Sequence, residues 1–116
     1  MKVEFESRGE VSLVTITGSI DSLTAEALLS QLHAHVADGH VCLVADFGGV
    51  DYTSSAGLRV LLSTVKETRR GGGDLRLATV NQRVFKVLEL SGFTTIIRFY
   101  DGVDVAIASY AAPAAV

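Results

Sequence analysis

The chain has one cysteine, one proline and no tryptophan among its 116 residues. Because Cys42 has no second cysteine to pair with, an internal disulfide is excluded. Cys42 lies within the apolar run VCLVADF (41–47), and this position predicts a small core residue. A single buried thiol is consistent with a reducing compartment.

Long apolar runs are also absent. No segment approaches the roughly 18 uninterrupted apolar residues of a membrane-spanning helix. The first ten residues, MKVEFESRGE, carry charges where a secretory signal would have its apolar stretch. We therefore expect a cytoplasmic protein that has no membrane partner.

Positive charge is sparse as well. The 10 Lys and Arg residues are outnumbered by 13 Asp and Glu residues, which gives a net charge of -3. The basic residues are scattered apart from the pair Arg69 and Arg70, so there is no basic stripe to bind a phosphate backbone, and we expect no nucleic-acid partner. The length and the hydrophobic share of 48% are typical of one globular domain, which we place at residues 1–116.

Hydrophobic periodicity indicates that strands and helices alternate along the chain. Residues 2–18 alternate apolar and polar positions around a polar centre, which predicts two strands joined by a tight hairpin. Helical spacing begins at Asp21 and ends near Gly39. The apolar run at 41–47 predicts a buried central strand that ends at the glycine pair 48–49.

The second half of the chain continues this alternation. In order, the predicted elements are a helix from near Ser55 to the glycines 71–73, a strand at 74–80, a short helix from Asn81 to Gly92, a strand at 94–100, and a helix from Asp101 towards Pro113. The whole pattern predicts a single α/β domain, in which a mixed, mostly parallel five-stranded sheet carries about four helices.

The stretch VDYTSSAGL (50–58) lies where a strand gives way to a helix, and functional sites of parallel sheets tend to lie at the carboxyl ends of strands. Either Ser54 or Ser55 can accept hydrogen bonds from the first N–H groups of the helix as its cap. Alternatively, one hydroxyl points outward and carries a phosphoryl group near the positive end of the helix dipole. The residues alone leave both interpretations open.

Catalytic and metal sites find little support in the sequence. Ser55 and Gly57 supply half of a nucleophile elbow, but Thr53 stands where the first glycine is required. The three histidines lie in or just after the first helix, without an orienting carboxylate or a metal-ligand spacing: His33, His35 and His40. The GGGD turn lacks the lysine of a phosphate loop. We therefore expect no enzymatic activity and no cofactor.

Acidic residues beside strand ends have two interpretations. Asp21, Asp46 and Asp51 could together bind magnesium at the sheet edge, as in receiver domains. Alternatively, Asp21 is only a helix cap and Asp51 only a turn residue.

Five segments, in this order and spacing, are similar to those of one known family. They are TGSID (17–21), the apolar strand that ends at Asp46, YTSSAGLRVLL (52–62), the GGGD turn (71–74) and FKVLELSGFTTIIRFY (85–100). On these segments the chain resembles the STAS domains of bacterial anti-sigma factor antagonists over nearly its whole length. The resemblance implies one STAS domain across residues 1–116.

The resemblance also implies site residues. In that family the phosphorylated serine lies in D-S-[ST]-G-L, two residues before the glycine, and counting back from Gly57 selects Ser55. This chain departs from the pattern with Ser54 at the aspartate position, Ala56 at the third position and Ser19 where glutamate is usual. The resemblance places a partner-binding surface at Asp21, Asp46, Thr53, Ser54, Leu58 and Arg59.

The function implied by the resemblance is partner switching without catalysis. A serine kinase of the histidine-kinase-like ATPase type, itself the anti-sigma factor, would bind the unmodified chain and phosphorylate it with its own ATP and Mg²⁺. A PP2C-type phosphatase would reset the switch. Two other interpretations stay open: a STAS scaffold subunit of a stress-signalling or transport assembly that is never phosphorylated, and a small α/β enzyme or ligand-binding domain, which would need a substantial pocket.

Overall fold

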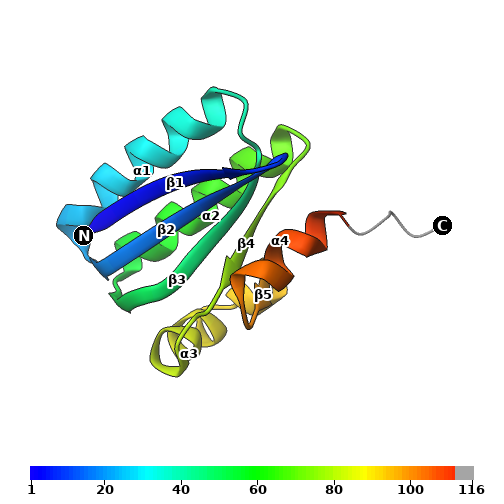
Figure 1. The fold of residues 1–116 in the computed structure, drawn as a ribbon. Helices are drawn as coiled ribbons and strands as arrows, with labels where there is room; N and C mark the ends of the chain where they lie inside the picture. Colours follow the sequence, from blue (N-terminus) through cyan, green and yellow to red (C-terminus); the bar gives the residue numbers. More distant parts are fainter. Residues whose placement is uncertain (112–116) are drawn as a thin grey trace.

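The computed structural model describes residues 1–111, which form one five-stranded sheet with four α-helices (Figure 1). The elements, in chain order, are β1 (Lys2–Arg8), β2 (Val11–Ile20), α1 (Ser22–Ala37), β3 (Cys42–Thr53), α2 (Ser55–Arg70), β4 (Asp74–Ala78), α3 (Gln82–Leu90), the 3₁₀ turn η1 (Phe93–Thr95), β5 (Arg98–Tyr100) and α4 (Val103–Ala111). No helix within these residues is long and apolar enough to cross a membrane. The predicted fold class is confirmed. Pro113, predicted to follow the last helix, lies outside the described residues.

The sheet is mixed, with strands in the order β1-β2-β3-β4-β5. Only β1 runs antiparallel to its neighbour, as the predicted hairpin requires, and the other three pairings are parallel. Gly9 forms the hairpin turn with a φ of 65°, a conformation that glycine adopts without a Cβ penalty. Parallel strands with helical crossovers place their carboxyl ends at one edge of the sheet.

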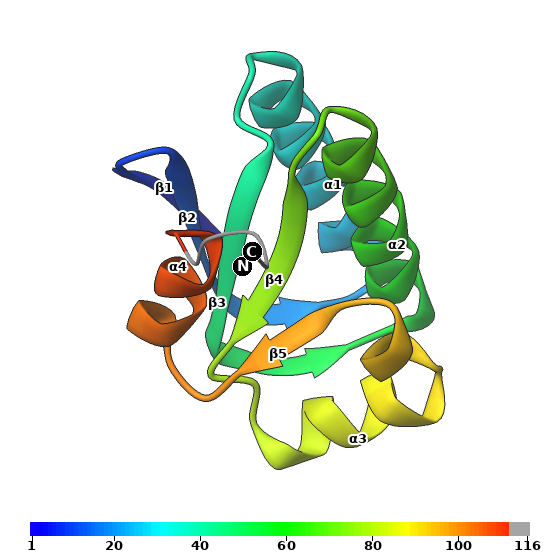
Figure 2. The ribbon, with the colours of Figure 1, turned by 90° about the vertical axis from the view of Figure 1, so that its right-hand side faces the viewer.

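The helices form layers on both faces of the sheet. Figure 2 shows α1 and α2 on one face and α4 on the other, while α3 lies beyond the carboxyl ends of the central strands. The larger core fills the space between the sheet and the pair α1 and α2, and its fully buried side chains include Val14, Ile16, Leu28, Leu43, Phe47, Leu61 and Leu77. A smaller core beneath α4 contains Val11, Leu13, Val44, Ala78 and Ala106.

The predicted end of the central strand is wrong. Strand β3 continues past Gly48 and Gly49 to Thr53, because Gly49 still pairs with Thr17 and Val50 is buried at 1% exposure. A Cβ at Gly49 would lie 3.1–3.3 Å from atoms of Thr17, so the close approach of the two strands favours a glycine there. The glycine pair therefore marks an irregularity inside the strand.

Three later boundaries also differ from the prediction. The strand predicted at 94–100 shortens to β5, because residues 93–95 form a 3₁₀ turn in which Phe93 and Ile97 are buried. Helix α4 begins at Val103, two residues after the predicted Asp101. Strand β4 ends at Ala78, since Thr79 adopts a φ of 58° that a strand cannot contain.

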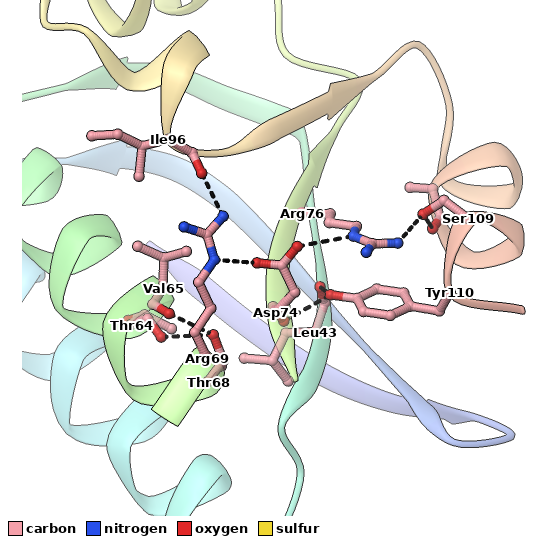
Figure 3. Close-up of polar contacts among 11 residues, drawn as sticks. Leu43, Thr64, Val65, Thr68, Arg69, Asp74, Arg76, Ile96, Ser109 and Tyr110 are labelled. Atoms are coloured by element: carbon pink, nitrogen blue, oxygen red, sulfur yellow. Dashed lines mark hydrogen bonds and ion pairs between the residues drawn. The ribbon is translucent and has the colours of Figure 1, made fainter. Parts of the chain in front are cut away.

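A polar network joins four elements at the amino ends of β4 and β5 (Figure 3). The Asp74 carboxylate accepts hydrogen bonds from Arg69 Nε at 2.9 Å and from Arg76 Nε at 3.1 Å. Arg69 also donates to the Ile96 carbonyl, and the Arg76 guanidinium stacks 3.9 Å above the Tyr110 ring. These contacts fix α2, β4, α4 and the segment before β5 to one another.

Tyr110 closes this network on the α4 side. Its hydroxyl lies 2.7 Å from the backbone carbonyl oxygens of Leu43 and Asp74, so it bridges β3 and β4 (Figure 3). Burial, reinforced by the Asp74 charge, raises the pKa of Tyr110 far above its ordinary value. The hydroxyl therefore remains protonated and able to donate.

Candidate functional site

Ser54 caps helix α2. It has extended backbone angles (φ -87°, ψ 175°), and its Oγ accepts a hydrogen bond from Gly57 N at 3.3 Å. Its own N–H donates to the Ile20 carbonyl at 2.8 Å, which fixes the junction between β3 and α2 to the end of β2. Of the two serines for which the sequence allowed a capping role, Ser54 fills it.

Ser55 is in a different situation. It is the first residue of α2 and is exposed, and within residues 1–111 its hydroxyl takes no part in a hydrogen bond. The cap needs only one of the two hydroxyls. The Ser55 side chain is therefore available for chemistry that leaves the helix start intact.

Gly57 allows the first turn of α2 to sit directly on the strand ends. A Cβ at this position would clash with Thr53 Oγ1 and approach Ile20 Cγ2 to 2.8 Å. Thr53 itself is buried at 4% exposure, so its predicted contribution to a partner surface can only be indirect. This close packing fixes the position of the first turn of α2, and therefore of Ser55, relative to the strand ends.

Asp21 begins helix α1 beside the same junction. Its Oδ1 accepts from Leu23 N and Thr24 N, each at 2.9 Å, and Thr24 Oγ1 accepts from the Asp21 N–H in return. The hydrogen bond from Thr24 N, with that from Leu23 N, lowers the pKa of the Asp21 carboxyl, which stays ionised near neutral pH. The predicted helix cap is confirmed, and it also places a fixed negative charge near α2.

A further acidic residue lies at the neighbouring strand end. Ser19 Oγ donates to Asp51 Oδ1 at 2.7 Å, across the register in which Ser19 pairs with Tyr52. The serine that replaces the glutamate usual in the family therefore supports an aspartate on the next strand. The predicted alternative role of Asp51 as a turn residue is wrong, because Asp51 lies inside β3.

Two large apolar side chains are exposed at this edge. Leu23 is 85% exposed and Tyr52 is 52% exposed. Leu23 does carry a signal in the sequence, since it lies off the buried stripe Ala25, Leu28 and Leu32 of α1. Together the exposed edge comprises Ser19, Asp21, Leu23, Asp51, Tyr52, Ser54 and Ser55, and we call it the serine rim.

Asp46 lies away from the serine rim. Its Oδ1 accepts from Gly48 N at 2.9 Å and from Thr79 Oγ1 at 2.6 Å, so it holds the left-handed Thr79 after β4. Seven residues separate it from Thr53, which corresponds to about 20 Å along an extended strand. The three aspartates of the magnesium interpretation thus have separate partners, and within residues 1–111 no cluster of three potential metal ligands is present.

Leu58 and Arg59 occupy the first turns of α2. Leu58 is half-buried and packs against the larger core, whereas Arg59 is exposed. Arg59 and Glu26 line a groove of about 470 Å³ between α1 and α2. Their partner-binding roles stay predictions.

The histidines lie towards the other end of α1. His33 approaches Glu67 at 3.1 Å, and His35 Nε2 lies 2.5 Å from Ser12 Oγ while its ring stacks on His40. His33 is about 17 Å along the helix from Ser22, given a rise of about 1.5 Å per residue. No histidine is therefore placed to activate Ser55. His35 is half-buried, whereas His33 and His40 are exposed.

Comparison with known proteins places this geometry in a family. Residues 2–106 match the model of the STAS domain. The chain belongs to the STAS domain family. The predicted family resemblance is thereby confirmed over most of the sequence.

Similar STAS proteins carry related names. BtrV of Bordetella bronchiseptica, provisionally named an anti-sigma factor antagonist, is 34% identical over 110 residues, covering 95% of each chain. The crystal structure of an anti-sigma factor antagonist from Mycobacterium paratuberculosis has a TM-score of 0.85 at 28% identity, covering 93% of this chain and 92% of the other. The phosphorylated form of the Bacillus cell fate determinant SpoIIAA shares the fold, with a TM-score of 0.74 at 17% identity over 94% of this chain and 99% of the other.

Proposed function

We propose that this STAS domain is an anti-sigma factor antagonist that is switched by phosphorylation of Ser55. The division of roles between the two serines carries the proposal: Ser54 is engaged as the α2 cap, while Ser55 is exposed. The names of the similar proteins support the antagonist function. The phosphorylated structure of SpoIIAA supports modification of a STAS fold.

The partner in this proposal is a serine kinase of the histidine-kinase-like ATPase type that is also the anti-sigma factor. The kinase transfers the γ-phosphoryl group of its Mg²⁺-bound ATP to Ser55 Oγ; the hydroxyl proton is lost and ADP is released. A PP2C-type phosphatase then hydrolyses the phosphoserine. The chain itself acts as a regulator rather than an enzyme, and we place it in the cytoplasm with these partners.

The serine rim offers a contact surface with suitable chemistry for such a partner. Leu23 and Tyr52 supply exposed apolar area, which is the usual anchor of a protein interface. Ser55 belongs to the same edge of the sheet as the Asp21 and Asp51 carboxylates, each of which is held by a hydrogen bond. Binding of the unmodified chain would cover this edge and keep the kinase from its other client, such as a sigma factor.

Phosphate can reverse this binding without a change of fold. It adds about -1.5 to -2 charge to a surface that already carries two carboxylates. A loss of only about 2.7 kcal/mol of binding free energy lowers the affinity a hundredfold. Electrostatic repulsion and desolvation of one phosphate within a contact surface are sufficient for a change of this size.

The decisive measurement is the mass of the peptide that ends at Arg59, from protein purified at several growth stages. Phosphate localised to Ser55 supports the proposal, and phosphate on Ser54 would move the modification to the capping residue. If no growth stage yields phosphate on either serine, a STAS scaffold that is never phosphorylated becomes the better account. In binding assays with the kinase, Ser55→Ala should bind as the unmodified chain does and Ser55→Asp should bind poorly.

A further inference from the structure

The groove between α1 and α2 begins next to Ser55. Its apolar floor includes Ala25 and Val60, both buried, and its volume is about 470 Å³. Two charged side chains line it, Glu26 from α1 and Arg59 from α2, and both are exposed. Within residues 1–111 neither side chain forms an ion pair, so the Arg59 guanidinium has its hydrogen-bond donors available.

Arg59 stands one helical turn after Ser55. Residues four apart on a helix share one face, with their Cβ atoms about 5–6 Å apart. Side chains on a helix also lean towards its N-terminus, and this general tendency favours an Arg59 side chain that extends towards Ser55. A group attached to Ser55 Oγ would therefore come within reach of the guanidinium.

Arg59 is the only basic side chain in residues 17–26 and 48–63, which form this part of the surface; the N-terminal ammonium is a second positive charge here, and it helps to lower the pKa of Asp21. Residues 17–26 and 48–63 contain three acidic residues, Asp21, Glu26 and Asp51, and a single basic residue, Arg59. Any dianion attached to Ser55 has carboxylates around it and one guanidinium within reach along α2. Arginine pairs with phosphate oxygens through two parallel hydrogen bonds, a geometry that lysine cannot reproduce.

We infer that Arg59 is the counter-ion of the phosphate on Ser55, and that phosphorylation thereby withdraws the guanidinium from the α1–α2 groove. This inference rests on the proposed function, since it needs Ser55 to carry phosphate. In the unmodified chain Arg59 offers the groove a site for a carboxylate of the partner. In the phosphorylated chain Arg59 is engaged, and Glu26 is the remaining charge that lines the groove.

The inference gives Arg59 a positioning role in the switch. Phosphate would weaken binding both by the charge it adds at the serine rim and by the partner contact that Arg59 no longer makes. The second effect acts along α2, beyond the point of modification. A phosphomimetic carboxylate at position 55 is shorter and carries less charge, so we expect it to engage Arg59 less completely than phosphate does.

The test uses the full chain with phosphoserine installed at position 55 during translation, so that no kinase is needed. The second pKa of the phosphate, ordinarily about 6, is measured by ³¹P NMR titration. Pairing with Arg59 stabilises the dianion and lowers this pKa. Arg59→Gln should therefore raise it by about 0.3 unit or more, and Arg59→Lys should raise it by less.

The matched control is Arg70→Gln, which removes an exposed arginine from the far end of the same helix, about 16 Å further along it at about 1.5 Å per residue. It should leave the phosphate pKa within about 0.1 unit of the parent value, since exposed charges at such distances are largely screened by salt. A second readout is the Arg59 Nε–H signal in ¹⁵N spectra, which should shift when phosphate is present. Backbone amide spectra report whether each variant is folded.

The inference is overturned if Arg59→Gln leaves the phosphate pKa unchanged, or if Arg70→Gln changes it equally. Its failure is distinguishable from failure of the proposed function. The titration asks where an installed phosphate is held, whereas the peptide mass from cells asks whether Ser55 receives phosphate at all. Either experiment can fail while the other succeeds.

Discussion

The two ends of the sheet are built in opposite ways. At the amino ends of β4 and β5, Asp74 joins two arginines, and Tyr110 bridges two strands (Figure 3). At the carboxyl ends of β2 and β3, the serine rim exposes a free hydroxyl, two fixed carboxylates and two large apolar side chains. The difference indicates that polar contacts secure the fold at one end, whereas the other end leaves a hydroxyl exposed.

The largest loss of stability should come from a substitution that disrupts the polar network around Asp74. Asp74→Ala leaves the Arg76 guanidinium, whose side chain is only 12% exposed, without its carboxylate, and also releases Arg69. We expect a loss of about 2–3 kcal/mol in the free energy of unfolding, measured by urea denaturation. Asp74→Asn keeps the shape and should lose less. Equal stability of Asp74→Ala and the parent chain would show that this network does not secure the fold.

Gly57→Ala tests the one place where the serine rim depends on close packing. The added Cβ would clash with Thr53 Oγ1 and crowd Ile20, so α2 must shift away from the strand ends. We expect a loss of about 1–3 kcal/mol on thermal or urea unfolding, together with poorer modification of Ser55. Gly72→Ala is a useful contrast, because it has open space around its Cβ and the cost there comes only from its φ of 90°. A Gly57→Ala chain as stable as the parent would contradict the close approach.

Substitutions at the two adjacent serines should affect different properties: one should lower the stability of the fold, and the other should prevent phosphorylation. Ser54→Ala removes the α2 cap and should cost about 1 kcal/mol, while phosphate can still be added to Ser55. Ser55→Ala should change the stability by less than about 0.5 kcal/mol and abolish phosphorylation. When both variants are measured, Ser54→Ala should be the less stable in denaturation, whereas Ser55→Ala should be the one that incorporates no phosphate. The same ranking in both assays would mean that the assignment of cap and acceptor is wrong.

The smallest expected effect is on the pH dependence of stability. It involves His35, which lies near the amino end of β2. Burial, together with the neighbouring His40, lowers the pKa of His35, while Asp38 opposes this in part. Because the folded state disfavours protonation of His35, the full stability should be present above the unfolded pKa of about 6.5, and it should decrease slightly as the pH drops below that value. His35→Gln should flatten this dependence between about pH 7 and pH 5 in urea titrations. An unchanged slope would assign the dependence to other groups.

Much of the fold could be predicted because its signals are local. The apolar stripe of α1, the cap at Asp21 and the glycines after α2 each specify an element within a few neighbouring residues. The glycine pair 48–49 misled the prediction, since it reads as a turn and is tolerated inside β3 only by a close pairing with β2. Asp46 was consequently placed at a strand end when it lies well inside the strand.

The residues taken alone predicted where the candidate site lies but not which serine caps the helix; the selection of Ser55 for phosphorylation came from the family resemblance. Capping rules identified the pair Ser54 and Ser55, but the choice between them depends on where β3 ends and on the hydrogen bond from Ser54 N to Ile20. The network around Asp74 was not predicted at all. Its members Leu43 and Tyr110 are 67 residues apart in the sequence, and no local pattern marks such a pair.

Because Ser54 rather than Ser55 caps α2, phosphorylation of Ser55 should not affect how long the protein persists in the cell. Phosphate on Ser55 would leave the capping hydroxyl and the Asp74 network unchanged, so both forms would unfold and be degraded at similar rates. The total pool would then stay constant while its modified fraction varies. The signal would be set by the balance of kinase and phosphatase, and dephosphorylation could return modified protein to use without new synthesis.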